Sequence, residues 1–313
     1  MLYAQLCGGL GNQMFQYACA RALSERLGQE LCLDFSFYNA TPSAEQDPRG
    51  LFELFSYNIK YDSLIFSWRE LHERYGPKHR QSEALLRFYE GFSKTFGKNS
   101  RAAAERLCAP FANFGFGLYA CEDRFIKEYP TRSHDAVMTG YRQSERYFKA
   151  IASEIKKELR LKTPPSKDDA ALYEQIRSSE AVCVHVRRGD YASKELAGLY
   201  LVCTPEYYSR GAQLLAQKTE DPVFYVFSDD PDWAKNNIRL EGETVCIKGS
   251  RRACEELRLM SACRHFVISN SSFSWWAQYL CEREKGTVVA PSRWYANGRK
   301  TDIYQNNWQL LDC

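Results

Sequence analysis

The sequence has no long apolar run, no closely spaced cysteine pair and little net charge, and each absence excludes a class of protein. No stretch approaches the roughly 20 apolar residues of a membrane-spanning helix. The pattern of a signal peptide, a basic start followed by an apolar run, is not seen, so we expect no signal peptide. The twelve cysteines include no C-x-x-C pair, which disfavours zinc and predicts buried thiols in a reducing compartment. We expect a cytoplasmic protein without a transmembrane segment; peripheral association with the inner membrane face stays open.

The charged residues point away from a large anionic partner. The net charge is +3 over 313 residues and the basic residues form no long stripe, so we expect no nucleic-acid partner. Local pairs such as Arg187-Arg188 and Arg251-Arg252 favour a small anionic ligand. An apolar fraction of 44% supplies a real core, and the length fits two ordinary domains or one large domain.

The first 35 residues predict the opening of a Rossmann-like domain. The expected elements are a strand at Leu2–Cys7, a tight loop at Gly8–Gln13, a helix at Gln13–Leu27 and a strand at Glu30–Phe35. Apolar residues recur on one face of the helix, and Gly28 is suited to end it as a cap.

The glycine loop partly matches the dinucleotide fingerprint G-x-G-x-x-G, with Asp34 as the acid for a ribose. The third glycine is missing because Met14 stands there, so NAD binding is disfavoured. The loop nevertheless supplies Gly11 for close approach of the backbone to a ligand. It also supplies two amides, Asn12 and Gln13, which can hydrogen-bond hydroxyl groups without adding charge.

The middle of the chain indicates a domain boundary. Residues 40–135 are rich in Arg, Phe and Tyr without clear strand–helix alternation, and their rings fit ordinary packing better than a sugar-binding surface. Residues 143–161 show helical periodicity and predict one amphipathic helix. The stretch Thr163–Asp169 (TPPSKDD) has a Pro-Pro break and several charges, which is typical of a linker. We therefore expect domains at 1–162 and 163–313.

The second half alternates strands and helices, which predicts a parallel sheet with right-handed crossovers. The expected strands are Ala181–Val186, Val223–Phe227, Thr244–Ile247, His265–Ile268 and Thr287–Ala290. The expected helices are Pro205–Lys218, a short helix after Asp230, Arg252–Cys263 and Phe273–Leu280. Thr204 is the expected N-cap of the first of them. Together with the first half, this predicts an α/β protein of two Rossmann-like domains facing one another across a cleft.

Three of these strands end in polar loops, HVRRGD, FSDD and SNSSFS, which parallel strands bring to one edge of the sheet. Arg187 and Arg188 can neutralise phosphate, since a guanidinium stays charged and can hold two oxygens. Asp229 and His185 can hydrogen-bond a base edge, and a carboxylate suits guanine. The serines at a helix start favour an anion; these are Ser271, Ser272 and Ser274. Separately, the motifs also fit an ion-pair cluster, a turn and an N-cap; jointly they favour a nucleoside-diphosphate site.

The sequence Asp230-Pro231-Asp232 forms a D-x-D, which elsewhere chelates a metal that holds a sugar nucleotide. It stands where a helix is expected to start, so the two acids fit the first turn of that helix more simply. With two arginines available for the phosphates, we expect no metal and no cofactor.

The motifs GGLGNQMFQYA, GYRQSERYF, HVRRGDY, FSDD and SNSSFSWWAQYL resemble those of the α1,2-fucosyltransferase family of bacterial type. They occur in family order from residue 8 to about 295, so the resemblance covers nearly the whole chain. It implies an inverting, GDP-fucose-dependent glycosyltransferase of GT-B type, with the acceptor on the N-terminal side and GDP-fucose on the C-terminal side. The expected acceptor is a terminal β-galactose of an oligosaccharide or polysaccharide, and residues 40–135 are where acceptor choice is expected to be set.

The resemblance also implies roles for individual residues. Arg187 is similar to the arginine that grips the donor's β-phosphate, and Ser272–Ser274, including Phe273, resembles the phosphate-side loop. Asn12 and Gln13 are similar to first-domain residues that face the fucose. Asp190 is the candidate catalytic base because it is the carboxylate closest in sequence to Arg187; pairing with Arg188 is the alternative.

Two other functions stay open from the sequence. One is a transferase that uses another sugar nucleotide on a similar frame. The other is a non-catalytic nucleotide- or glycan-binding protein. A phosphate-binding motif together with a separate N-terminal loop favours chemistry over binding alone.

Overall fold

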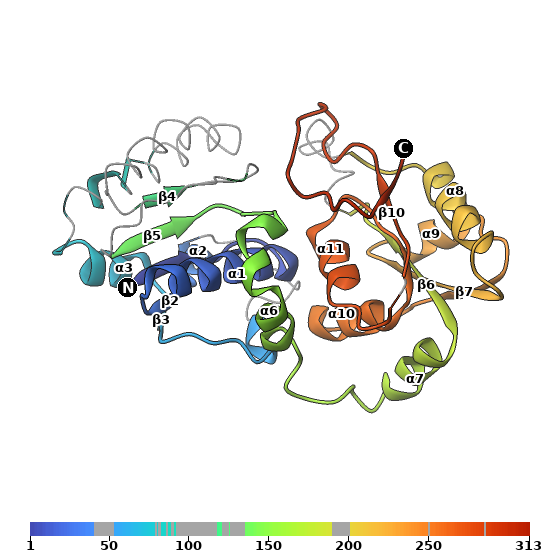
Figure 1. The fold of residues 1–313 in the computed structure, drawn as a ribbon, viewed down its shortest axis with the longest axis horizontal. Coiled ribbons are helices and arrows are strands. Elements are labelled where there is room, and N and C mark those ends of the chain that lie inside the picture. Colours follow the sequence, from blue (N-terminus) through green and yellow to red (C-terminus); the bar gives the residue numbers. More distant parts are fainter. Residues whose placement is uncertain are drawn as a thin grey trace. The chain divides into compact units, whose positions relative to one another are not determined.

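The computed structural model describes residues 1–40, 53–78, 80, 83–85, 87–88, 91, 118–120, 125, 135–189, 201–249, 251–284 and 286–313. The chain divides into two compact units, Met1–Lys162 and Thr163–Cys313. Each contains a parallel sheet with helices packed against it (Figure 1). No helix among the described residues is long and apolar enough to cross a membrane.

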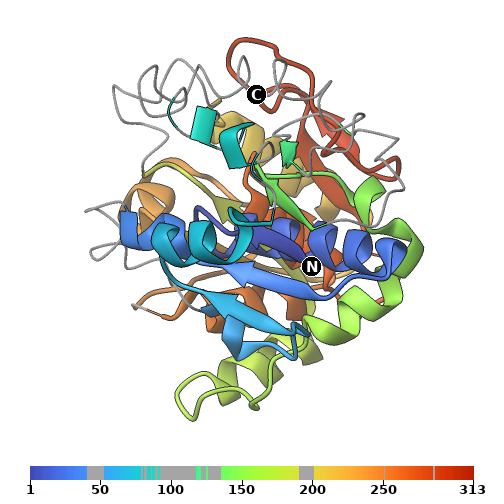
Figure 2. The same ribbon diagram turned by 90° about the vertical axis from the view of Figure 1, so that its left-hand side faces the viewer.

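The N-terminal unit contains a five-stranded sheet in the order β3-β2-β1-β5-β4. Its strands are β1 (Leu2–Gln5), β2 (Leu31–Asp34), β3 (Ser63–Ile65), β4 (Leu118–Ala120) and β5 (Ala136–Thr139). Its helices are α1 (Leu10–Leu27), α2 (Ser36–Ala40), α3 (Trp68–Tyr75) and α6 (Ala152–Glu158), with 3₁₀ turns at Glu53–Ser56, Glu145–Tyr147 and Lys149–Ile151. Figure 2 turns this unit toward the viewer and shows β1 to β3, in blue to cyan, side by side.

The packing of this sheet follows the alternation of side chains along its strands. Tyr3 of β1 and Cys32 of β2 point to one face, where α3 covers them with Leu71 and Tyr75. The rings of Tyr3 and Tyr75 meet edge to face, with centroids 5.6 Å apart. Because α3 follows β3 directly, residues 63–75 form a strand–helix pair that the sequence did not reveal.

The helix α1 starts inside the glycine loop, three residues before the expected position. Gly9 is its N-cap, and Gly28, with φ of +62°, ends it as predicted. The turn into the helix depends on Gly8, whose φ is +76° and where a Cβ would lie 2.7 Å from Asn12 Nδ2. Asn12 and Gln13 therefore lie in the first helical turn.

The prediction of one continuous helix over residues 143–161 is wrong. Residues 145–151 form two 3₁₀ turns, and only Ala152–Glu158 is α-helical. The break occurs at Phe148, whose φ of −125° is not helical. Its ring is fully buried, and the ring centroid lies 6.3 Å from that of Phe15 in α1. Burying this ring in the core outweighs the periodicity of the surrounding sequence.

The C-terminal unit contains a six-stranded sheet in the order β11-β10-β9-β6-β7-β8. Its strands are β6 (Glu180–Val186), β7 (Pro222–Ser228), β8 (Glu243–Cys246), β9 (His265–Val267), β10 (Val288–Pro291) and β11 (Gln309–Leu311). Its helices are α7 (Ala170–Ser178), α8 (Pro205–Ala216), α9 (Pro231–Asn237), α10 (Ala253–Ala262) and α11 (Ser272–Tyr279). The five predicted strands are present within two residues; α7 and β11 were not predicted.

Helices cover both faces of this sheet, as buried parallel strands require. Figure 1 shows α8 and α9 on one side of it and α10 and α11 on the other. Val182, Val184 and Val186 of β6 pack with α8 residues such as Tyr208 and Leu215. The intervening residues, including His185, therefore point to the α10–α11 face.

Candidate active site

The strand order of the C-terminal sheet reverses between β6 and β9. Ligands of open α/β sheets bind outside the carboxyl ends of the strands at such a reversal. Because β6 lies between β7 and β9, the loops after these three strands are neighbours. They are the loops that contain HVRRGD, FSDD and SNSSFS, so the sheet order brings the three predicted motifs to one edge.

Asp229 holds the loop that carries both arginines. Its Oδ2 lies 3.1 Å from Arg187 Nη1, and its Oδ1 accepts the backbone N–H of Arg188 at 2.9 Å. Gly189 leaves room for this carboxylate, because a Cβ there would lie 2.7 Å from Asp229 Oδ2. Both oxygens thus face the arginine loop, and a contact of Asp229 with guanine stays a prediction.

His185 is a buried, neutral residue at the reversal point itself. Its Nδ1 lies 3.1 Å from Oγ of Ser269, a residue in the loop after β9. Its ring centroid lies 5.9 Å from that of Phe273 in α11. Burial, with the nearby charge of Arg187 as a second cause, lowers the pKa of His185 to about 3. The imidazole can donate or accept a hydrogen bond, but it does not change its charge near neutral pH.

The serine loop uses its hydroxyls to build the start of α11. Ser271 is the N-cap, and its Oγ accepts the Phe273 N–H at 3.2 Å. Ser274 is fully buried, and its hydroxyl lies 3.2 Å from the carbonyls of both Ser269 and Ser271. Ser272 is the first residue of the helix. These bonds present the helix N-terminus, with its backbone N–H groups, at the same edge as the arginines.

The N-terminal sheet has its own reversal point, between β1 and β5. Asn12, after β1, accepts a hydrogen bond from Gln143 Nε2, after β5, at 2.8 Å. This bond fixes the orientation of the Asn12 amide. Gln143 belongs to the GYRQSERYF motif, but that motif alone does not assign it a role.

Gly11 and Gln13, in the first turn of α1, are both buried. Gln13 is fully buried, and its amide donates to the Gly8 carbonyl at 3.1 Å and to Tyr38 Oη at 2.8 Å. Tyr38 also donates to the Gly8 carbonyl, at 2.6 Å. Gln13 thus anchors the glycine turn to α2, and contacts of Gln13 or Gly11 with a donor stay predictions.

Asp34 is not placed to bind a ribose. It is fully buried at the end of β2, and its Oδ1 accepts the Ser36 N–H at 2.8 Å. Burial raises the pKa of this carboxyl to about 6. Met14, at the position of the missing third glycine, is also fully buried, so the loop offers no dinucleotide cradle at that point.

The two acids of the D-x-D belong to the start of α9. Asp230 is its N-cap, and its Oδ1 accepts the Trp233 N–H at 3.1 Å; Asp232 is in the first turn. Among the described residues, no group of three His, Cys, Asp or Glu side chains is placed to hold a metal ion. Asp190, the predicted base, lies outside the described residues.

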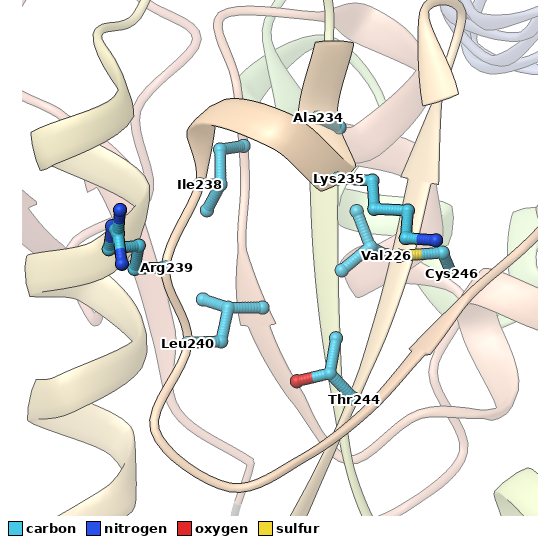
Figure 3. Close-up of a pocket in the computed structure, with 8 residues that line it drawn as sticks. All are labelled: Val226, Ala234, Lys235, Ile238, Arg239, Leu240, Thr244 and Cys246. Carbon is cyan, nitrogen blue, oxygen red and sulfur yellow. The ribbon is translucent and has the colours of Figure 1, made fainter. Parts of the chain in front are cut away.

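A pocket of about 430 Å³ lies beside α9 rather than at the strand ends. Its walls come from β7, β8, α9 and the segment after α9 (Figure 3): Val226, Ala234, Lys235, Ile238, Arg239, Leu240, Thr244 and Cys246. Val226 belongs to the core under α8, on the face opposite His185. The lining contains neither a carboxylate nor an imidazole, so it offers no acid–base pair for catalysis.

Two Rossmann-like units of this kind define the GT-B class of glycosyltransferases. The fucosyltransferase NodZ from Bradyrhizobium has the same fold, with a TM-score of 0.54 at 15% identity over 88% of this chain and 91% of its own. The family model for glycosyl transferase family 11 matches residues 118–312. The chain belongs to this family.

Relatives of known activity match over most of the chain. The Escherichia coli O-antigen biosynthesis glycosyltransferase WbnK is 29% identical over 98% of this chain and 99% of its own. An alpha-1,2-colitosyltransferase from Escherichia coli is 31% identical over 94% of this chain and 92% of its own. The mouse galactoside 2-alpha-L-fucosyltransferase Sec1 is 30% identical over 47% of this chain and 42% of its own.

Proposed function

We propose that the protein is a galactoside α1,2-fucosyltransferase that moves L-fucose from GDP-β-L-fucose, with inversion, to the 2-hydroxyl of a terminal β-galactose. The observation that carries the proposal is the convergence of two guanidinium groups, a neutral imidazole and a helix N-terminus at one strand-order reversal. Such a set suits a nucleoside diphosphate better than a neutral ligand.

The chemistry assigned to these groups is stabilisation of the leaving diphosphate. Negative charge develops on the β-phosphate as the glycosidic bond breaks, and Arg187 is the cation held for it, since Asp229 fixes its Nη1 at 3.1 Å. A preorganised donor needs no reorganisation during the reaction. We propose that the N-terminus of α11 shares this charge and that Asp190 accepts the proton of the acceptor hydroxyl.

The N-terminal unit is proposed to contact the sugar and the acceptor. Asn12 is the residue to which we assign a catalytic contact, because its Oδ1 is already engaged by Gln143. The Nδ2 group of the fixed amide is the donor that a hydroxyl of the transferred sugar would meet. We propose metal independence because Asp230 uses one carboxylate oxygen to cap α9; a cytoplasmic location stays a prediction from the sequence.

A second donor is favoured by one observation, the 31% identity to an alpha-1,2-colitosyltransferase over 94% of the chain. Colitose is fucose without its 3-hydroxyl, so either sugar can be carried by the same nucleotide. A site that hydrogen-bonds that hydroxyl would reject colitose strongly, because its polar groups would be left unpaired. Competition between the two GDP-sugars for one acceptor distinguishes these donors.

The test is calorimetric titration with GDP, UDP and NAD, with and without EDTA. We expect GDP to bind, with chelation having no effect, and UDP and NAD to bind at least tenfold more weakly. Slow release of fucose from GDP-fucose in the absence of acceptor is expected of a transferase and not of a binding protein. Preference for UDP, or loss of GDP binding in EDTA, would contradict the assignment of donor and of metal independence.

A further inference from the structure

The guanidinium of Arg188 is held against the ring of Trp233, a residue that neither the motifs nor the proposed chemistry uses. Its Cζ lies 3.7 Å from the ring centroid of Trp233, in the first turn of α9. Its Nε is 4.0 Å from Asp230 Oδ2, and its backbone N–H is bonded to Asp229. A ring face, a carboxylate and a backbone anchor, all from residues 229–233, thus constrain one side chain.

Hydrogen bonds and a proline hold the shape of this segment. The N–H of Asp230 donates to Ser228 Oγ at 3.0 Å, and its Oδ1 accepts the Trp233 N–H at 3.1 Å. Pro231 occupies the first turn of α9 and fixes its own φ there. The indole of Trp233 also packs against the core under α8. The ring that supports Arg188 is therefore fixed by the fold.

The ion pair of Arg188 orients the guanidinium without a hydrogen bond from Nε to the carboxylate. At 4.0 Å from Nε, Asp230 is beyond hydrogen-bond distance. Arg187, in contrast, lies 3.1 Å from its carboxylate partner. The ring face attracts the cation without cancelling its charge. A cation held in this way is suited to meet an anion.

We propose that Trp233 is a positioning residue that holds the Arg188 guanidinium in place for the nucleoside diphosphate of the donor. The inference rests on the proposed function, because Arg188 must lie in the donor site for its position to matter. An arginine side chain loses rotational freedom when it binds an oxyanion, and a prior stack on an aromatic ring removes much of that cost beforehand.

The test compares Trp233→Leu, which keeps apolar bulk but has no ring face, with Trp233→Tyr, which keeps a ring. We expect Trp233→Leu to weaken GDP binding about tenfold by calorimetry, as the loss of a cation–π contact predicts. Trp233→Tyr is expected to stay within threefold of the unsubstituted protein. The unfolding temperature of each variant shows whether a change in its GDP affinity is accompanied by a loss of stability.

A double-mutant cycle separates positioning from direct contact with the ligand. In an Arg188→Ala background, Trp233→Leu is expected to cause no further loss of GDP affinity. Arg188→Lys leaves the core untouched and is expected to lose affinity about as much as Arg188→Ala, because an ammonium has no plane to stack. It therefore tests the inference even if Trp233→Leu does not fold.

A control is Trp308→Leu, since Trp308 is a buried tryptophan that precedes β11, at the opposite edge of the same sheet. It is expected to lower the unfolding temperature without changing GDP affinity. Normal GDP binding by Trp233→Leu, or additive losses in the cycle, would overturn the positioning role while leaving the donor site intact. Normal GDP binding by both Arg187→Ala and Arg188→Ala would instead reject the donor site and, with it, the proposed function.

Discussion

Gly189→Ala tests the geometry of the arginine loop with a single methyl group. The new Cβ would stand 2.7 Å from Asp229 Oδ2, so this carboxylate must retreat by roughly 0.7 Å to reach the ordinary contact distance of 3.4 Å. Asp229 cannot move alone, because Arg187 and the Arg188 N–H are both bound to it. We therefore expect the Arg187 guanidinium to shift with it.

The expected loss is catalytic rather than structural. Misplacing a reacting group by about 1 Å can cost about 100-fold in rate, so we expect kcat/KM to fall by about 10- to 100-fold. Gly189 does not have a positive φ, and Gly→Ala at a compatible position gains about 0.4–1 kcal/mol through the unfolded state. Weakening a partly exposed ion pair costs about as much. The free energy of unfolding is therefore expected to change by less than about 1 kcal/mol.

The assay is initial-rate kinetics with GDP-fucose and a β-galactoside, together with chemical denaturation of the same preparation. In an Asp229→Ala background the added methyl has no carboxylate to displace, so no further loss is expected. Full activity of Gly189→Ala would show that this carboxylate does not position Arg187 for the reaction.

Two further predictions concern Arg187 and Asp34. Arg187→Ala is expected to lower kcat by about 10²–10³, the usual cost of one preorganised donor, with the unfolding temperature retained; turnover within threefold of normal would rule out its role on the β-phosphate. Burial raises the pKa of Asp34 from 3.8 to about 6 in the folded protein, so its contribution to stability is present below pH 3.8 and is lost as the pH rises through 6. The loss amounts to about 3 kcal/mol. Asp34→Asn is therefore expected to gain up to that amount, relative to the unsubstituted protein, between pH 4 and pH 8 in denaturant titrations; parallel stability curves would refute the assignment.

The sequence predicted most where local signals and fold rules agree. Thr204 caps α8 by accepting the Tyr207 N–H at 3.3 Å, and Gly28 ends α1 in the left-handed region. Strand-end motifs were enough to predict which loops meet, because parallel strands share one edge. Periodicity failed at residues 143–161, where a tertiary contact of Phe148 with Phe15 decides the backbone.

Individual side-chain contacts between segments distant in sequence were beyond prediction. The stacking of Arg188 on Trp233 joins residues 45 positions apart, and no local pattern marks Trp233 as a partner for a cation. The bond between Asn12 and Gln143 spans 131 positions. The motifs include Arg188 but not Trp233, and they include both Asn12 and Gln143 without linking them. Only the fold brings the members of each pair together.

A family motif at a strand end mixes two kinds of residue, and the structure separates them by burial. Gln13 and Ser274 are fully buried. Their side chains donate hydrogen bonds to the carbonyls of Gly8 and Ser269, and these bonds hold the shape of the two loops. The side chains of Arg187 and Arg188 keep 22% and 25% exposure. Ser271 and Ser274 hold the start of α11, so the two guanidinium groups and the backbone N–H groups of the α11 N-terminus are what these loops can offer an anion.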